Sequence, residues 1–400
     1  MAETGFLQVV SSFTSTPIES SLRQGIVQAG VGDGLGFIQY GQMSEYMLSP
    51  ASDSTHILGT LVLLRVEDWL RQGLKSRDWD PTIGPWARQE LRARVDEFVS
   101  HLTTLARRGK QVWFLACPSS GWISERHKLG TLLRSYTNLL VARIQSIPHV
   151  AALSWPAALL KGEIDDRHAD RLGQIPFTRD AFDQLGEILG AQIARTRKRT
   201  APDPSAVSCN GSSPELAAYL AGLGVQVEVA VAGPDDRSHV DRLLRTAATF
   251  TLTGEKRDLA EGEIDSLLES KSSMLIRVSD RLSDQGPSGV VAFHAFEDAL
   301  VVHSMALSCA VLGKQVEYAA VAALAQLAAE RHFSKLVFEY SSSGRNQFTL
   351  DFLQSIANRE SNTRFVLPLD VAESRLSAAA VSAGAWTLKL ERTLESSTVQ

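Results

Sequence analysis

The chain has 400 residues, of which 44% are hydrophobic, and its 45 acidic and 40 basic side chains give a formal net charge of −5. This length predicts two or three domains with apolar cores, and the near balance of charge argues against a nucleic-acid partner. The sequence offers neither a signal peptide nor an apolar stretch of the ~20 residues that cross a membrane, so we expect a cytoplasmic protein with no membrane partner.

The first half of the chain alternates short apolar runs with amphipathic helical stretches. The apolar runs predict strands at residues 5–10, 34–40, 56–66, 111–118 and 150–155. The helical stretches lie at residues 18–30, 85–108 and 127–145, and a last helix begins after its N-cap at Thr178. Continuously apolar strands joined by helices pair in parallel. Residues 1–198 are therefore predicted to form a doubly wound, flavodoxin-like α/β domain.

Residues 199–213 interrupt this pattern. They contain prolines and serines without hydrophobic periodicity, which predicts a linker. Beyond it, helices are predicted at residues 213–224, 235–250 and 260–270, and strands at residues 225–232 and 272–279. This order predicts a mixed α+β domain over residues 214–400.

The last third of the chain contains two strands, a glycine-containing turn, a long helix, another strand and a polar turn that opens a further helix. The order resembles that of GNAT-type acyl-CoA-dependent N-acyltransferases, in which a Q/R-x-x-G-x-G/A turn and the next helix N-terminus hold a pyrophosphate. The resemblance implies a cofactor site for acyl-CoA or a carrier-protein phosphopantetheine, made by Leu312, Gly313, Lys314, Gln315 and Val316. Ala310 and Gln315 depart from the pattern, because they stand where Arg or Gln and a small residue are usual.

Three residues near this turn are candidate catalytic groups. His303 precedes the turn on a strand, and its imidazole can act as a base because it titrates near neutrality. Glu339 is a second candidate base, and Asn346 can orient an acyl or amine group. The alternatives are a structural histidine and a carboxylate that pairs with Arg345.

Several segments together resemble FkbH-like proteins of polyketide and nonribosomal peptide pathways, which place a glyceryl unit on an acyl carrier protein. Residues 216–268, 278–293, 308–321 and 339–353 resemble the C-terminal part of that family, and residues 11–22, 44–52, 61–70 and 171–182 resemble its SGNH-like first domain. The family's HAD phosphatase domain, with its D-x-D-x-T motif, is missing where the linker stands. The resemblance implies an acyltransferase without the phosphatase step, acting with an acyl or peptidyl carrier protein of a synthase.

The N-terminal domain offers a rival site. SGNH-type esterases place a nucleophilic serine after the first strand and an Asp-x-x-His before the last helix. Ser12, or its neighbour Ser11, and the pair Asp165 and His168 occupy such positions, although Gln174 stands where the FkbH-like family has a histidine. Two alternative functions follow, a serine hydrolase and a non-catalytic scaffold that binds carrier proteins.

The cysteines argue against a metal site. Cys117, Cys209 and Cys309 lie far apart and form no CxxC motif. We therefore expect neither a disulfide framework nor a zinc site, and no metal cofactor.

Overall fold

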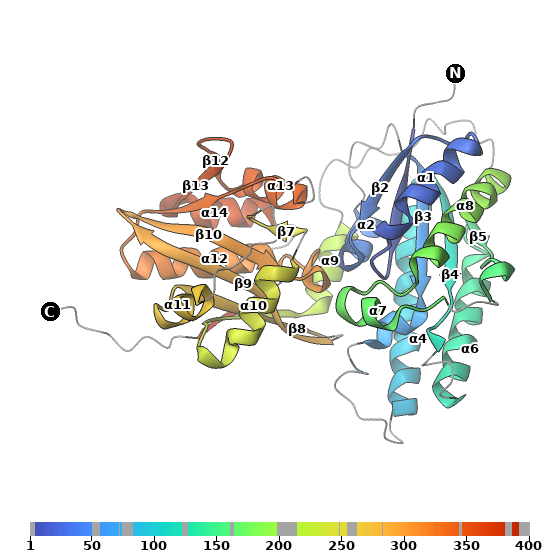
Figure 1. Ribbon diagram of the computed structural model, residues 1–400, viewed down its shortest axis with the longest axis horizontal. Helices are drawn as coiled ribbons and strands as arrows, with labels where there is room; N and C mark the ends of the chain where they lie inside the picture. The colour runs from blue at the N-terminus through green and yellow to red at the C-terminus, as the bar shows by residue number, and fades with distance from the viewer. Residues whose placement is uncertain are drawn as a thin grey trace. The chain divides into compact units, whose positions relative to one another are not determined.

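The structure, a computed structural model, contains two compact units, residues 1–213 and 214–400 (Figure 1). It describes residues 5–49, 57–71, 73, 83–121, 127–160, 164–197, 214–247, 249–253, 262–281, 283–343, 346–380 and 386–391. The linker predicted at 199–213 lies outside these described residues.

The first unit contains a five-stranded sheet in the order β2-β1-β3-β4-β5. All of its strand pairs are parallel, which confirms the predicted doubly wound α/β fold. The strands are β1 (Phe6–Ser11), β2 (Gly34–Ile38), β3 (Ile57–Arg65), β4 (Gln111–Cys117) and β5 (Val150–Leu153).

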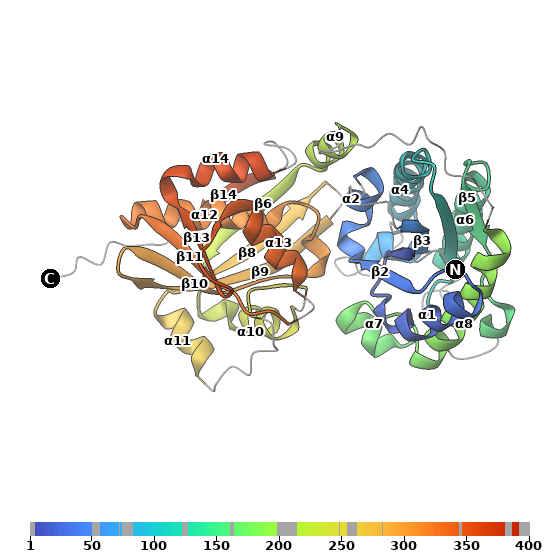
Figure 2. The same cartoon turned by 90° about the horizontal axis from the view of Figure 1, so that it is seen from above.

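Helices cover both faces of this sheet (Figure 2). On one side lie α1 (Glu19–Gln28) and α8 (Arg179–Thr196), and on the other α2 (Met43–Leu48), α4 (Ile83–Ala106) and α6 (His127–Ile144). The side chains of β3 alternate between the two cores, with Leu61 and Leu63 in one and Val62 and Leu64 in the other. This double burial explains why the strand reads as a continuous apolar run.

Two helix starts of the first unit have side-chain caps. The predicted cap of α8 is present, since the Thr178 hydroxyl accepts a hydrogen bond from Ala181 N at 3.3 Å. The short helix α7 (Arg167–Gly173) is capped by Asp166, whose carboxylate accepts from Ala169 N at 2.9 Å. Both caps satisfy backbone N–H groups that the helix itself leaves unpaired.

Helices α1 and α8 approach each other through glycines. A Cβ atom built on Gly190 would lie 2.3 Å from the carbonyl carbon of Gly25, and one built on Gly186 would lie 2.2 Å from Ser21 Oγ. The absence of side chains at these positions therefore sets the distance between the first and the last helix of the unit.

The second unit is built on a mixed sheet in the order β12-β13-β11-β10-β9-β8-β6-β14, with β7 paired to β10. The pairs β10–β11 and β6–β14 are parallel and the other pairs are antiparallel, which confirms the predicted mixed α/β class. The strands are β6 (Val225–Val231), β7 (Phe250–Thr251), β8 (Ser273–Asp280), β9 (Ser283–Phe296), β10 (Ala299–Leu307), β11 (Lys335–Glu339), β12 (Asn358–Arg359), β13 (Arg364–Pro368) and β14 (Trp386–Glu391).

Figure 2 shows α10 (Arg237–Thr246) and α11 (Glu263–Glu269) on one side of this sheet, and α12 (Val316–Glu330) and α14 (Leu369–Ala379) on the other. The unit also contains α9 (Pro214–Leu223) and α13 (Gln347–Ile356). One expectation needs correction. The helix predicted over residues 235–250 ends at Thr246, and Phe250 begins the strand β7.

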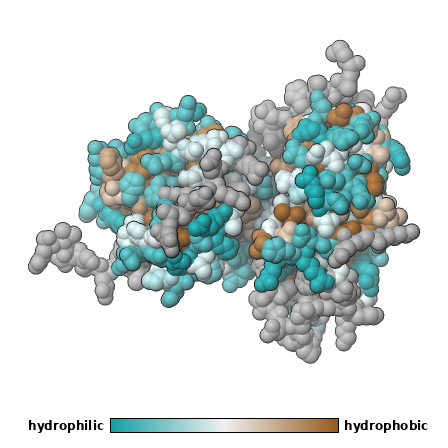
Figure 3. Space-filling view, in the orientation of Figure 1, coloured by the Kyte–Doolittle hydropathy of each residue, from teal (hydrophilic) through white to brown (hydrophobic). Residues whose placement is uncertain are grey.

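The visible surface of both units is mostly hydrophilic, with hydrophobic residues in small separate patches (Figure 3). Among the described residues, the exposed large hydrophobic side chains are Val27, Leu139, Leu172 and Phe296, which come from four different elements. None of the helices in the described part of the chain is long and apolar enough to cross a membrane.

Candidate functional site

The first candidate site lies at the carboxyl edge of the parallel sheet, where β1 and β3 end side by side. Ser12 follows β1 and binds the end of β3 through its backbone, since Ser12 N donates to Leu63 O at 3.0 Å. In the order β2-β1-β3, β2 lies on one side of β1, and β3 and the later strands lie on the other, so the strand order reverses at β1. Ligands of open α/β sheets bind in the crevice at the carboxyl ends of the strands at such a switch point.

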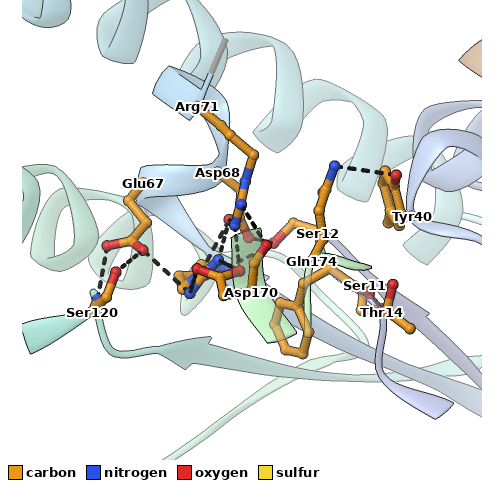
Figure 4. A network of polar contacts seen from close by, with 12 residues as sticks. Ser11, Ser12, Thr14, Tyr40, Glu67, Asp68, Arg71, Ser120, Asp170 and Gln174 are labelled. Atoms are coloured by element: carbon orange, nitrogen blue, oxygen red, sulfur yellow. Dashed lines mark hydrogen bonds and ion pairs between the residues drawn. The ribbon is translucent and has the colours of Figure 1, made fainter. Parts of the chain in front are cut away.

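A buried arginine organises this edge. Arg65, which is 0% exposed, donates from Nη2 to Asp68 Oδ1 at 2.6 Å and to Asp170 Oδ1 at 2.9 Å, and its Nη1 lies 3.2 Å from Glu67 Oε1. Arg71 binds the same atoms of Asp68 and Asp170 at 2.9 and 2.7 Å. Figure 4 shows Arg71, Asp68 and Asp170 converging, with Glu67 beside them. A buried charge loses its hydration, and these ion pairs and hydrogen bonds compensate for that loss.

The network shifts the pKa values of its members in different directions. Burial would lower the pKa of Arg65, but the charge of Asp68 and its carboxylate neighbours raises it. Burial would raise the pKa of Asp170, and the charge of Arg65 brings it below its ordinary value. For Glu67, burial outweighs Arg65 and raises the pKa, although Ser120 donates to this carboxylate from both its N–H and its hydroxyl.

The structure holds Ser12 within this network. Ser12 is 8% exposed. Its hydroxyl donates to Asp68 Oδ2 at 2.7 Å and accepts from Arg65 N at 3.0 Å. His168 is exposed on α7, and no hydrogen bond of the described residues joins it to Ser12. Asp165 accepts from Gly121 N at 2.5 Å, and burial raises its pKa. Ser12 and Asp165 thus have different hydrogen-bond partners, and no hydrogen bond of the described residues links either of them to His168.

Two further predicted positions also lie at this edge. The Ser11 hydroxyl donates to Phe13 O at 2.6 Å, which makes it part of the turn after β1. Gln174 has a left-handed backbone with φ of 53° and donates from Nε2 to Tyr40 Oη at 3.1 Å (Figure 4). The carbonyl of Gln174 accepts from Thr14 N at 2.9 Å. Gln174 therefore joins three loops at the carboxyl edge of the sheet.

The arginine and carboxylate network is not among the sites expected from the sequence. A signal was present, because the apolar run of β3 ends directly in Arg65-Val66-Glu67-Asp68. Charged residues directly after a strand buried on both faces lie at its carboxyl end, where functional groups of this fold gather.

The second candidate site lies in the C-terminal unit, at the turn between β10 and α12. Gly313 has φ of 77° and Gln315 has φ of 61°, so two residues of this turn are left-handed. Leu312 and Val316 are 0% exposed and fix the turn to the core. The first backbone N–H groups of an α-helix have no partner within the helix. At the start of α12 the N-cap residue Gln315 makes no side-chain capping hydrogen bond to them.

The charge expected from Lys314 is already paired. Its Nζ lies 2.6 Å from Oδ2 of Asp280 on β8, whose side chain is 0% exposed. Gln315 is 4% exposed, and no donor in the described part of the chain binds its Oε1. The positive field at this turn therefore comes from the helix N-terminus rather than from a free lysine.

The candidate bases are on neighbouring strands. His303 is the extra residue of a bulge in β10, between the pairs Val302–Phe293 and Ser304–Ala292. Its ring centroid lies 5.6 Å from that of His294 on β9. Glu339 is exposed at the end of β11. Bulges often occur beside active sites because they redirect a side chain.

Asn346 is completely buried and uses its whole amide group within the chain. Its Oδ1 accepts from Tyr340 Oη at 3.2 Å and from Ser343 N and Oγ at 2.9 and 3.1 Å. Its Nδ2 donates to Thr251 O at 3.0 Å and Ser341 O at 2.9 Å. Asn346 thus fastens the loop after β11 to β7.

Metal ligation has no visible basis in the described residues, where no three His, Cys, Asp or Glu side chains gather in a way that could hold an ion. Cys117 is buried, and burial raises the pKa of its thiol. Cys309 is partly buried, and its pKa is raised for the same reason. Neither thiol has the lowered pKa that marks a reactive cysteine.

No family model and no curated protein matches this chain. Among solved structures, the N-terminal part of the Bacteroides fragilis protein BF1531, which contains a phosphatase domain, matches 46% of this chain with 14% identity and a TM-score of 0.36. The chain covers 50% of the length of that structure.

Two acetyltransferases each match about a third of this chain. A putative GNAT-family acetyltransferase from Desulfovibrio desulfuricans matches 36% of this chain and 99% of its own, with 15% identity and a TM-score of 0.30. PaiA N-acetyltransferase from Thermoplasma acidophilum, in complex with coenzyme A, matches 35% and 96%, with 9% identity and a TM-score of 0.25. At these values function has to be inferred from the geometry of the chain itself.

Proposed function

We propose that residues 214–400 form an acyltransferase that moves an acyl unit to or from the thiol of a phosphopantetheine arm, carried by coenzyme A or by a carrier protein. The observation that carries the proposal is the path from β10 through the left-handed Gly313 to α12 and β11. In it, β10 continues to Leu307, past its last pair with β11 at Val302–Phe338, and the turn that follows leads to the N-terminus of α12.

The turn suits one phosphate group. A helix N-terminus attracts an anion through the positive end of its dipole and through the first N–H groups, which have no partner within the helix. The start of α12 directs such a terminus at the turn. Because Lys314 is paired with Asp280, no second cation of this turn is available for a pyrophosphate. The single phosphate of a carrier-bound phosphopantetheine is therefore the better fit.

The transfer itself needs a base. His303 or Glu339 takes a proton from an attacking thiol, amine or hydroxyl, whose heteroatom then bonds to the thioester carbonyl carbon. The carbon–sulfur bond breaks, and the pantetheine thiol leaves with a proton. The His303 imidazole lies beside the ring of His294, with the two ring planes tilted by 33°.

The biological setting is part of the proposal. The similarity of several segments to FkbH-like proteins supports a role in polyketide or nonribosomal peptide biosynthesis, with an acyl or peptidyl carrier protein as the partner. The acyl donor and acceptor are then both presented on phosphopantetheine arms or coenzyme A.

The test follows acyl transfer by intact mass spectrometry, with acetyl-CoA or malonyl-CoA and an acyl carrier protein. We expect transfer by the wild type and a loss of at least about a hundredfold in His303→Asn or Glu339→Gln, the lower end of what a general base contributes. Glu187→Gln, an exposed change in the first unit, is the matched control. No transfer by the wild type under any acyl donor would refute the proposal.

A second candidate is a non-catalytic scaffold that binds carrier proteins. It is favoured by Asn346, whose amide is fully used within the chain, and by the pairing of Lys314. Calorimetry separates the two functions, because a scaffold binds a carrier protein equally well with and without its phosphopantetheine arm.

A further inference from the structure

The strand β7 occupies the place where β10 and β11 separate. The two parallel strands pair from Ala299–Lys335 to Val302–Phe338. Beyond that point, the edge of β10 pairs with β7 instead, through Ala306–Thr251 and Leu307–Phe250. A short segment between α10 and α11 thus covers the edge of β10 beyond its last pair with β11, just before the turn that contains Gly313.

Leu252 joins the two sides of the place where β10 and β11 separate. Its N–H donates to Met305 O on β10 at 3.1 Å, and its carbonyl accepts from Ser341 N, just after β11, at 2.8 Å. The backbone groups that the separating strands would leave unpaired are therefore satisfied by β7 and its neighbour Leu252.

Buried side chains hold β7 in place. Asn346 Nδ2 donates to Thr251 O at 3.0 Å, and Thr251 N donates to Thr349 Oγ1, also at 3.0 Å. Phe250 is 0% exposed, and its ring packs against those of Phe348 and Phe352 at 5.9 and 5.5 Å. The contacts come from α13 and its N-cap, so α13 acts as the clamp of β7.

A pantetheine arm needs the same edge. It is an extended chain with amide N–H and C=O groups, the same groups through which an extended peptide pairs with an open strand edge. An arm whose phosphate lies at the start of α12 reaches the edge of β10 next, which β7 covers. The arm and β7 therefore compete for Met305 and its neighbours.

We propose that β7 is a strap that closes the acyl-carrier site, and that a phosphopantetheine arm enters only when β7 leaves β10. The inference rests on the proposed function. Only Phe250 and Thr251 belong to the strand, so an arm can replace its hydrogen bonds. Gln315 Oε1, buried at the start of α12 without a donor among the described residues, then meets an N–H or O–H group of the arm.

A disulfide tests the strap. Thr251 and Ala306 are directly opposite on antiparallel strands, and the backbone hydrogen bond forms between the neighbouring pair, Leu252 and Met305. The Cβ atoms of a pair without backbone hydrogen bonds lie close together, so Thr251→Cys with Ala306→Cys suits a cross-strand disulfide. The full chain would carry Cys209→Ser and Cys309→Ser, since Cys309 lies near Thr249. Binding of coenzyme A and of 4′-phosphopantetheine is measured by calorimetry before and after reduction.

We expect the oxidised protein to bind at least about tenfold more weakly than the reduced protein, because locking the strap removes the competent state. The single variants Thr251→Cys and Ala306→Cys control for the oxidant. Thr349→Val, which removes one acceptor from β7, should bind about fivefold more tightly, the factor of one ordinary hydrogen bond, whereas Thr349→Ser should not.

The outcomes separate the two proposals. Equal binding by oxidised and reduced protein overturns the strap and leaves the acyltransferase proposal intact. Binding of neither probe by any form, including Thr349→Val, refutes the phosphopantetheine site itself and the strap with it.

Discussion

Replacing Arg65 by methionine should destabilise the first unit more than any exposed charge change. The side chain is 0% exposed and pairs with Asp68, Asp170 and Glu67. Removing it leaves three buried carboxylates with Arg71 as the cation for only two of them. Breaking a buried ion pair from one side costs about 3–5 kcal/mol, and we expect a loss in this range in the free energy of unfolding.

Urea unfolding followed by tryptophan fluorescence measures this loss. Six of the seven tryptophans, all except Trp386, precede residue 214, so the signal reports mainly the first unit. Arg179→Met is the matched control, because Arg179 and its partner Asp183 are 67% and 42% exposed. An exposed pair contributes little, and the control should change stability by less than about 1 kcal/mol.

A rescue experiment separates charge from volume. Adding Asp68→Asn and Asp170→Asn to Arg65→Met removes the uncompensated charges and should recover part of the loss. A loss by Arg65→Met no larger than that of Arg179→Met would refute the view that Arg65 neutralises buried carboxylates.

Three further predictions concern the first unit. Gly190→Ala should lower its stability by about 1–3 kcal/mol in urea unfolding, because the new methyl group meets the backbone of Gly25. Gly84→Ala, in α4 of the same unit and with nothing within 4 Å of its Cβ, should not destabilise the unit. Burial lowers the pKa of His101 from 6.5 to about 4. Between these two pH values the unfolded state binds more protons than the folded state, so the free energy of unfolding falls as the pH falls, by up to about 3 kcal/mol. His101→Gln should flatten that pH dependence of the urea midpoint, and parallel curves would contradict the assignment. A fluorophosphonate probe should not label the wild type, because the Ser12 hydroxyl donates its hydrogen bond to Asp68. Labelling of the wild type that disappears in Ser12→Ala would contradict this prediction and support a serine hydrolase.

The sequence was a good guide to the strands that are buried on both faces. The run at residues 56–66 became β3, and its neighbours formed the expected parallel sheet, because a continuous apolar run satisfies two cores at once. The left-handed Gly313 also stands at the predicted turn between strand and helix. These features depend on local composition, which a single sequence displays.

The features that the sequence did not display depend on distant partners. Arg65 and Asp170 are 105 positions apart, and their spacing carries no periodic signal. The strand β7 spans only Phe250–Thr251, too few residues for an alternating pattern, and the helical pattern of residues 235–250 extends over Phe250. What defines β7 is the open edge of β10, which exists only once the sheet has formed.

The contact between α1 and α8 has a consequence for protein synthesis. The first helix of the unit meets its last helix at Gly25 and Gly190, and Trp113 of β4 donates from Nε1 to Thr196 Oγ1 at 2.9 Å. The core that α1 and β4 share with α8 is therefore incomplete until the ribosome has released residue 196. A nascent chain paused before that point exposes the apolar face of α1, including Leu22 and Ile26, to chaperones.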